Sequence, residues 1–105
     1  MGNFNVIVST SAKDSIKKHT RFLANASVPA SRRLLGTFGK AIGALSQTPF
    51  AFPVFYNDYR KFTVLNRYAF LYEVIGTEVF LDKIIDMRSA EFNNITLENE
   101  NSRSE

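Results

Sequence analysis

Residues 59–74, YRKFTVLNRYAFLYEV, hold two short runs of β-branched and aromatic residues joined by the link Leu65–Asn66. Such runs predict two strands, Tyr59–Val64 and Tyr68–Ile75, that form a hairpin. The same stretch also carries cations and phenols. These polar side chains are either the solvated side of an ordinary sheet or part of a surface that binds phosphate.

Alternation along the hairpin predicts which side chains reach the core, because every second residue of a strand points to the same face. In the first strand, Phe62 and Val64 facing inward would place Lys61 outward, whereas a bulge would expose Arg60 instead. In the second strand the apolar set is expected to face the helices and its neighbours to face the open side: inward Tyr68, Phe70, Tyr72 and Val74; outward Arg67, Ala69, Leu71 and Glu73.

The segments before the hairpin predict one strand followed by two helices. Phe4–Ser9 is short and β-branched, as strands are. Ser11 can cap a first helix, with Asp14 three residues further on, and this helix extends to about Asn25. Pro29 suits the first turn of a second helix. Six apolar residues of that helix recur at helical spacing and are expected in the core: Leu34, Leu35, Phe38, Ala41, Ile42 and Leu45.

Three glycines, Gly36, Gly39 and Gly43, lie inside the second predicted helix at spacings of three and four. Each lowers helix propensity by roughly 1 kcal/mol relative to Ala. We therefore expect them to allow close packing against the first helix.

The element order predicts the fold class. The segment Pro49–Asp58 is expected to be a loop whose aromatic rings hold it to the edge of the core. The alternative is that these rings form a docking patch for a partner. Val79–Ile85 predicts a last strand after a turn at Gly76. The resulting order β-α-α-β-β-β predicts an α+β fold, with two N-terminal helices packed on one face of a small, mostly antiparallel four-stranded sheet. Residues 1–92 are expected to form one domain, and the polar residues 93–105 a flexible tail. The four rings of the loop are Phe50, Phe52, Phe55 and Tyr56.

Charge is unevenly distributed along the chain, although its formal net charge is only +3. Residues 12–47 hold seven cationic side chains and one carboxylate, whereas residues 89–105 hold four Glu and one Arg. This asymmetry favours an acidic or polyanionic partner for the helical half, with a solvated helix face as the alternative. The sequence has no Cys, no signal-peptide pattern and no membrane-length apolar run, which predicts a soluble cytoplasmic protein.

Most catalytic chemistries lack their residues in this sequence. His19 is the only histidine, it falls on the apolar side of the first helix, and no nucleophile motif accompanies it. Asp82 and Asp86 flank Lys83 and indicate neutralised surface charge. We therefore predict no metal site and no cofactor. What remains is Arg and Lys, which hold phosphate, and Tyr, which can stack on a base or move a proton.

Several segments together resemble the RelE/ParE superfamily of type II toxin–antitoxin toxins. They are FNVIVSTSAKDSIKKHTRFL (4–23), LSQTPFAFPVFY (45–56), YRKFTVLNRYAFLYEV (59–74) and VFLDKIIDMRS (79–89). The likeness covers about residues 5–89 and is most specific at RYAFLYEV and IIDMR. It implies the fold predicted above and a cognate acidic antitoxin, partly disordered, that wraps the toxin. Its expected landing site is the basic first helix, at Lys17, Lys18 and Arg21.

The resemblance also implies an activity, and the family divides at this point. RelE-like members are metal-independent endoribonucleases that cut mRNA on the ribosome, whereas ParE-like members poison DNA gyrase and cut nothing. The basic positions of RelE-like catalysis fall here on Arg60, Lys61, Arg67 and Arg88, which are the candidate catalytic residues.

The family pattern also has an arginine directly after the position of Tyr68, where this chain has Ala69, and no His or Tyr closes the C-terminal end. The resemblance therefore favours a ParE-like toxin acting on DNA gyrase. Two alternatives stay open: a RelE-like ribonuclease acting on ribosome-bound mRNA, and a catalytically inactive module that binds only its antitoxin.

Overall fold

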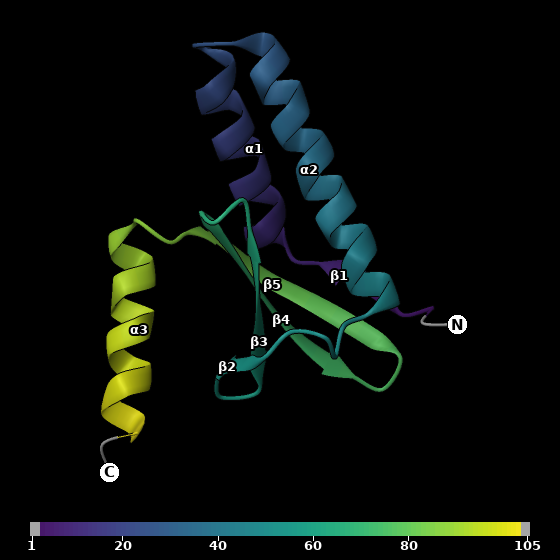
Figure 1. Ribbon diagram of the computed structural model, residues 1–105, viewed down its shortest axis with the longest axis vertical. Helices are drawn as coiled ribbons and strands as arrows, with labels where there is room; N and C mark the ends of the chain where they lie inside the picture. The colour runs from purple at the N-terminus through teal and green to yellow at the C-terminus, as the bar shows by residue number, and fades with distance from the viewer. Residues whose placement is uncertain (1–2, 104–105) are drawn as a thin grey trace.

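The computed structural model describes the backbone of residues 3–103 and the side chains of residues 3–97. Five strands form one sheet in the spatial order β1-β5-β4-β3-β2, and β1 is parallel to β5 while the other neighbours are antiparallel (Figure 1). The elements in chain order are β1 (Asn5–Val8), α1 (Thr10–Ala24), α2 (Val28–Gln47), β2 (Val54–Tyr56), β3 (Tyr59–Val64), β4 (Tyr68–Ile75), β5 (Glu78–Asp86) and α3 (Ala90–Arg103). The predicted α+β class with two N-terminal helices is confirmed.

The sheet has one strand more than the four predicted. The additional strand is β2, which lies inside the segment expected to be a loop and pairs with β3. Asn57, in the connection between β2 and β3, has a left-handed backbone with φ 50°. Asn tolerates that conformation better than most residues, so a chain reversal can be made in two residues there.

The two N-terminal helices are capped by serines. The prediction that Ser11 caps the first helix is wrong, because α1 begins one residue before it. The N-cap is Ser9, whose Oγ accepts a hydrogen bond from the Ala12 backbone N–H at 2.9 Å. Ser27 caps α2 in the same manner, and Pro29 lies in its first turn as predicted. Each cap satisfies a backbone donor that the helix itself cannot pair.

The main core lies between the helical hairpin α1–α2 and one face of the sheet. The predicted stripe of α2 is buried through Leu34, Phe38, Ala41 and Leu45, which pack on Tyr68, Phe70 and Tyr72 of β4. Two expectations about α2 are wrong. Leu35 is 54% exposed, and a Cβ added at Gly36, Gly39 or Gly43 would meet no atom within 4 Å. The glycines therefore face open space and do not serve close packing against α1.

The second face of the sheet, expected to be open, carries a smaller apolar cluster. Ala69, Leu71 and Ile85 are buried there, and Phe92 and Ile95 of α3 pack against them. Helix α3 thus lies on the opposite side of the sheet from α1 and α2 (Figure 1). The sequence predicted a flexible tail over residues 93–105. The structure describes helix α3 over Ala90–Arg103, and the last two residues of the predicted tail lie outside the described residues.

Aromatic rings hold the segment between α2 and β3 against the domain, as predicted. Phe52 stacks on Phe62 with ring centroids 4.0 Å apart, and Phe55 stacks on Phe92 of α3 at 5.9 Å. The Tyr72 hydroxyl donates a hydrogen bond to the Pro49 carbonyl oxygen at 2.6 Å, and burial raises the pKa of Tyr72 to about 12. Within residues 3–103, no helix combines the length and apolar composition that crossing a membrane requires.

Candidate functional site

Two arginines that are distant in sequence meet at one corner of the sheet, around a single carboxylate. Arg67 Nε lies 3.2 Å from Asp86 Oδ2, and Arg88 Nε lies 3.3 Å from Asp86 Oδ1. The Arg88 backbone N–H also donates to Asp86 Oδ1 at 2.9 Å. We call these three residues the arginine corner. Asp86 is its organising member, and the only sequence signal for it is its place in the segment IIDMR.

The strand register explains why these residues meet. In the pairing of β4 with β5, Tyr68 lies opposite Asp86, so the residue before β4 and the residues after β5 are neighbours in space. Arg67 belongs to the turn between β3 and β4, and its carbonyl oxygen accepts a hydrogen bond from the Met87 N–H at 2.8 Å. The prediction that Arg67 faces the open side is wrong, because alternation does not extend into a turn. Its side chain instead lines a groove against the helical hairpin.

Opposing effects act on the Asp86 carboxyl group. Partial burial by itself would raise the pKa of Asp86, but hydrogen bonds from the Arg88 side chain and backbone and from Arg67 outweigh burial and lower it to about 2. The same contact raises the pKa of Arg88. The corner is therefore a compact ionised cluster with one anion and two cations.

Tyr68 and His19 adjoin the arginine corner. The Tyr68 ring is buried, packs edge-on against His19 with centroids 5.1 Å apart, and has the Arg67 guanidinium 5.1 Å from its centroid. Burial lowers the pKa of His19, nearby Lys18 and Arg67 lower it further, and Asp86 opposes them. His19 is half-buried against Tyr68, the position that its place on the apolar side of the helix predicted.

The other two candidate catalytic residues lie elsewhere, and on opposite faces of the sheet. The Lys61 ammonium lies over the rings of Phe55 and Phe92 at 4.5 and 5.7 Å, on the side that α3 covers. Arg60 donates a hydrogen bond to the Phe52 carbonyl oxygen at 2.6 Å, on the side of Phe62 and the helices. Arg60 pairs across the sheet with Tyr72, at the far end of β3 from Val64 and the turn. The structure thus brings Arg67 and Arg88 together and leaves Arg60 and Lys61 apart from them.

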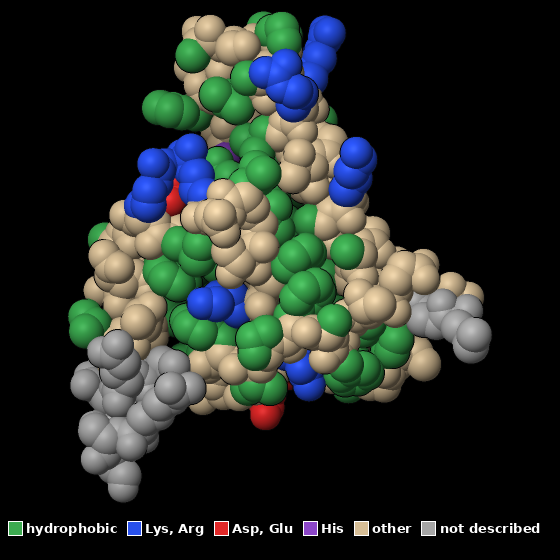
Figure 2. All heavy atoms as spheres, in the orientation of Figure 1, with side chains coloured by type: hydrophobic (Ala, Val, Ile, Leu, Met, Phe, Trp, Pro, Cys, Tyr) green, Lys and Arg blue, Asp and Glu red, His purple; other side chains and the backbone are tan. Residues whose placement is uncertain are grey.

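The candidate antitoxin contacts form an exposed basic surface on α1. Lys17, Lys18 and Arg21 are exposed, as expected for residues that attract a partner. On the face shown in Figure 2, further Lys and Arg side chains lie over α2, and others gather where the hairpin meets the sheet.

A groove of about 490 Å³ lies between the helical hairpin and the β3–β4 turn, and Arg67 of the arginine corner lines it. Leu65, which no sequence pattern singled out as functional, lies in the β3–β4 turn beside the groove and is 61% exposed. Leu65 is distinguished by its left-handed backbone conformation, with φ 57°, which only the structure reveals. The residues that line the groove are Leu23, Ala30, Arg33, Leu34, Thr37, Leu65, Arg67 and Tyr68.

The arrangement described above is that of a small α+β protein with a helical hairpin on one sheet face and a cationic corner at the sheet's end. No protein-family model and no curated protein matches the chain. Among solved structures, a chain of the chromosomal ParDE TA system from P. aeruginosa superposes with a TM-score of 0.71 and 12% sequence identity. The match covers 82% of this chain and 98% of that chain. This chain therefore shares the fold of that chain of a ParDE system.

Proposed function

We propose that this protein is the toxin of a type II toxin–antitoxin module, held inactive in the cytoplasm by a cognate acidic antitoxin. The observation that carries the proposal is the agreement of two independent findings. Sequence segments along most of the chain resemble the RelE/ParE superfamily, and the fold superposes on a chain of a ParDE system. The exposed basic side chains of α1 support an acidic partner.

Among the activities of this family, we favour a ParE-like action on DNA gyrase. A nuclease without a metal needs free cations to stabilise the charge that develops on phosphate. Here Arg67 and Arg88 both contact Asp86, while Arg60 and Lys61 lie at other places on the sheet. Ala69 is also buried beneath α3 and supplies no cation. This geometry supports binding to a protein target better than phosphoryl chemistry.

A RelE-like action on ribosome-bound mRNA is the second candidate, because the arginine corner adjoins Tyr68 and His19. One pair of assays separates the two. Purified protein is incubated with gyrase and supercoiled DNA, and separately with translating ribosomes. A ParE-like toxin traps cleaved gyrase–DNA complexes and leaves mRNA intact, whereas a RelE-like toxin cuts mRNA in phase with codons.

Growth assays test the toxin assignment itself. Expression of the chain alone is expected to arrest bacterial growth, and co-expression of an adjacent small acidic reading frame is expected to restore it. Soluble, folded protein that permits normal growth would contradict the toxin assignment and favour a module that only binds an antitoxin.

The arginine corner is best tested with a variant that keeps its hydrogen bonds. Replacing only the two arginines would leave Asp86, whose side chain is 16% exposed, with only the backbone N–H of residue 88 as a partner, and this would confuse loss of function with loss of stability. The triple variant R67Q/D86N/R88Q removes all three charges together. It is expected to fold and to lose toxicity; full toxicity of the folded triple variant would show that the corner is solvated surface.

A further inference from the structure

The sheet has a gap beside the end of β4, at the opposite end from the arginine corner. The pairing of β4 with β3 extends from Tyr68 to Tyr72, while Glu73–Ile75 pair with β5 only. Successive residues of a strand present their backbone N–H and C=O groups to opposite sides. At least one of these three residues therefore directs its backbone groups into the gap, which we call the β4 notch.

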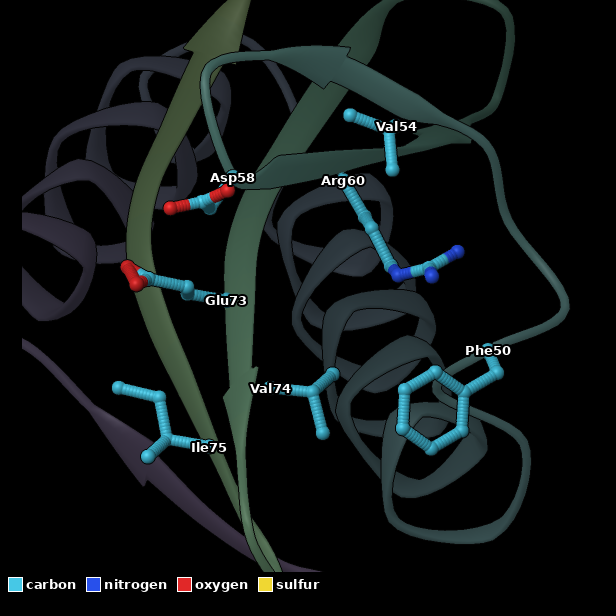
Figure 3. Close-up of a pocket in the computed structure, with 7 residues that line it drawn as sticks. All are labelled: Phe50, Val54, Asp58, Arg60, Glu73, Val74 and Ile75. Carbon is cyan, nitrogen blue, oxygen red and sulfur yellow. The ribbon is translucent and has the colours of Figure 1, made fainter.

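The β4 notch coincides with a pocket of about 350 Å³ (Figure 3). Apolar side chains from three segments line it, and three of them are large and mostly exposed: Phe50 at 59%, Val54 at 55% and Ile75 at 57%. Exposed apolar side chains are ordinary when scattered, but grouped around a concave site they indicate an interaction surface. The open strand edge and the apolar lining are independent observations at the same place.

The charges of the notch lie on two sides of β4. The carboxyl groups of Asp58 and Glu73 are on one side, and the Arg60 guanidinium is on the other, near Phe50 (Figure 3). Arg60 is already held by the Phe52 carbonyl oxygen. Within the described part of the chain, no cation lies within 4.0 Å of Asp58 or Glu73. The side of the notch that carries these carboxylates is therefore suited to a cationic side chain.

We propose that the β4 notch binds an extended segment of a partner protein, which adds to the sheet as a short strand in the row that β3 leaves empty. An extended chain supplies backbone hydrogen bonds to an open edge, and its alternate side chains reach the two faces. An apolar side chain would pack beside Phe50 and Val74. A neighbouring lysine or arginine would pair with Glu73 and Asp58. This proposal stands independently of the toxin assignment.

Binding is tested on the full chain with a blocked hexapeptide that alternates valine and lysine, by amide NMR titration. The expected result is saturable shifts centred on Glu73–Ile75 together with slower hydrogen exchange in that segment. A hexapeptide of the same sequence with N-methyl groups along one edge is expected to lose binding, because it cannot pair with the strand. Absent shifts, shifts centred elsewhere, or equal binding of the N-methylated peptide would overturn the proposal.

Charge variants test the recognition of a cation at this site. The double variant D58N/E73Q is expected to weaken binding of the lysine peptide by roughly five- to tenfold. D14N, which removes one carboxylate from the exposed side of α1, serves as the control and should leave the affinity unchanged. Equal affinity of a valine–glutamate hexapeptide would overturn the proposal. So would sedimentation showing a dimer that D58N/E73Q dissociates, because the notch would then be filled by a second copy.

Discussion

Asp86 decides the chemistry of the arginine corner, although its place in the sequence indicated only neutralised surface charge. Its two oxygens receive hydrogen bonds from Arg67 and Arg88, so both cations are fixed in direction and partly neutralised. A phosphate group approaching the corner would have to compete with this carboxylate. At the scale of the single residue, this contact is the strongest physical argument against ready phosphoryl chemistry.

The low pKa of Asp86 predicts how stability depends on pH. Its pKa is about 2 in the folded chain against an ordinary 3.8. Because the pKa of Asp86 is lower in the folded chain, its ionised form stabilises the fold above about pH 5, and this stabilisation is lost as the pH falls toward about 2. D86N should therefore be less stable than the parent at neutral pH, with the difference vanishing near the acid limit. Urea unfolding at several pH values measures this difference in stability. R88Q should show a smaller loss of stability in acid than the parent. Equal pH profiles for D86N and the parent would contradict the prediction.

Leu65 carries backbone strain that another residue would relieve. It has φ 57° and is 61% exposed, so little burial offsets the cost of its left-handed conformation. L65N is expected to raise the free energy of unfolding by about 0.5–1 kcal/mol, as measured by urea unfolding. The neighbouring N66L, at φ 52°, is the matched control and should lower it. Stabilisation by L65N combined with loss of toxicity would assign Leu65 to a partner contact.

At the scale of elements, the two helical layers differ in how firmly they are held. Helix α2 buries four side chains in the main core, including Phe38 at 1% exposure. Within its described side chains, α3 contacts the second sheet face mainly through Phe92 and Ile95, and Lys83 lies 3.8 Å from Glu91 at its start. Local unfolding free energies follow such differences in buried contact.

Hydrogen exchange should therefore separate α3 from the rest of the molecule. F92A removes the stack on Phe55 and the contact with Lys61, and it is expected to lower amide protection in α3 while α2 and β4 keep theirs. F38A should instead lower protection throughout, since replacing a buried Phe by Ala costs about 3–5 kcal/mol. A global loss of protection in F92A would show that α3 unfolds together with the core.

At the scale of the whole molecule, different surfaces suit different partners. The helical hairpin presents exposed cations, including Lys17, Lys18 and Arg21. The β4 notch at the other end presents the carboxylates of Asp58 and Glu73 beside apolar side chains. Long-range attraction to an acidic antitoxin would act on the first surface, and strand addition on the second. Under these two proposals, one small domain would bind two segments at once.

The basic surface of α1 makes a kinetic prediction. The variant K17E/K18E/R21E should slow association with the proposed acidic antitoxin at low salt and flatten its salt dependence, because exposed charges mainly steer the encounter. Stopped-flow mixing at several ionic strengths measures the rates, and circular dichroism checks the fold. At about 1 M salt, where the screening length is about 3 Å, the parent chain and the variant should associate with the antitoxin at similar rates. An unchanged rate at low salt would place the antitoxin elsewhere.

Local patterns in the sequence were sufficient for β1, the two N-terminal helices and strands β3 to β5, and for most of the main core. Helical spacing predicted the buried side of α2, and alternation predicted the inward set of β4, because both depend on residues only a few positions apart. The same patterns placed Leu35 in the core and missed β2 and α3. Leu35 lies at the margin of its stripe, and β2 and α3 are held by rings and apolar side chains from distant segments.

Only the tertiary structure decided which cations meet. Arg60 and Lys61 are adjacent in sequence, yet a strand sends adjacent side chains to opposite faces. Arg67 and Arg88 are far apart in sequence, yet the register that places Tyr68 opposite Asp86 joins them at one carboxylate. The notch likewise depends on where the pairing of β3 stops along β4. The tight turn at Gly76 sets the register at the start of the β4–β5 hairpin, but a shift of one residue between Leu71 and Tyr72 then brings Tyr68 opposite Asp86. Alternation along one strand predicts neither this shift nor the residue at which β3 stops pairing with β4.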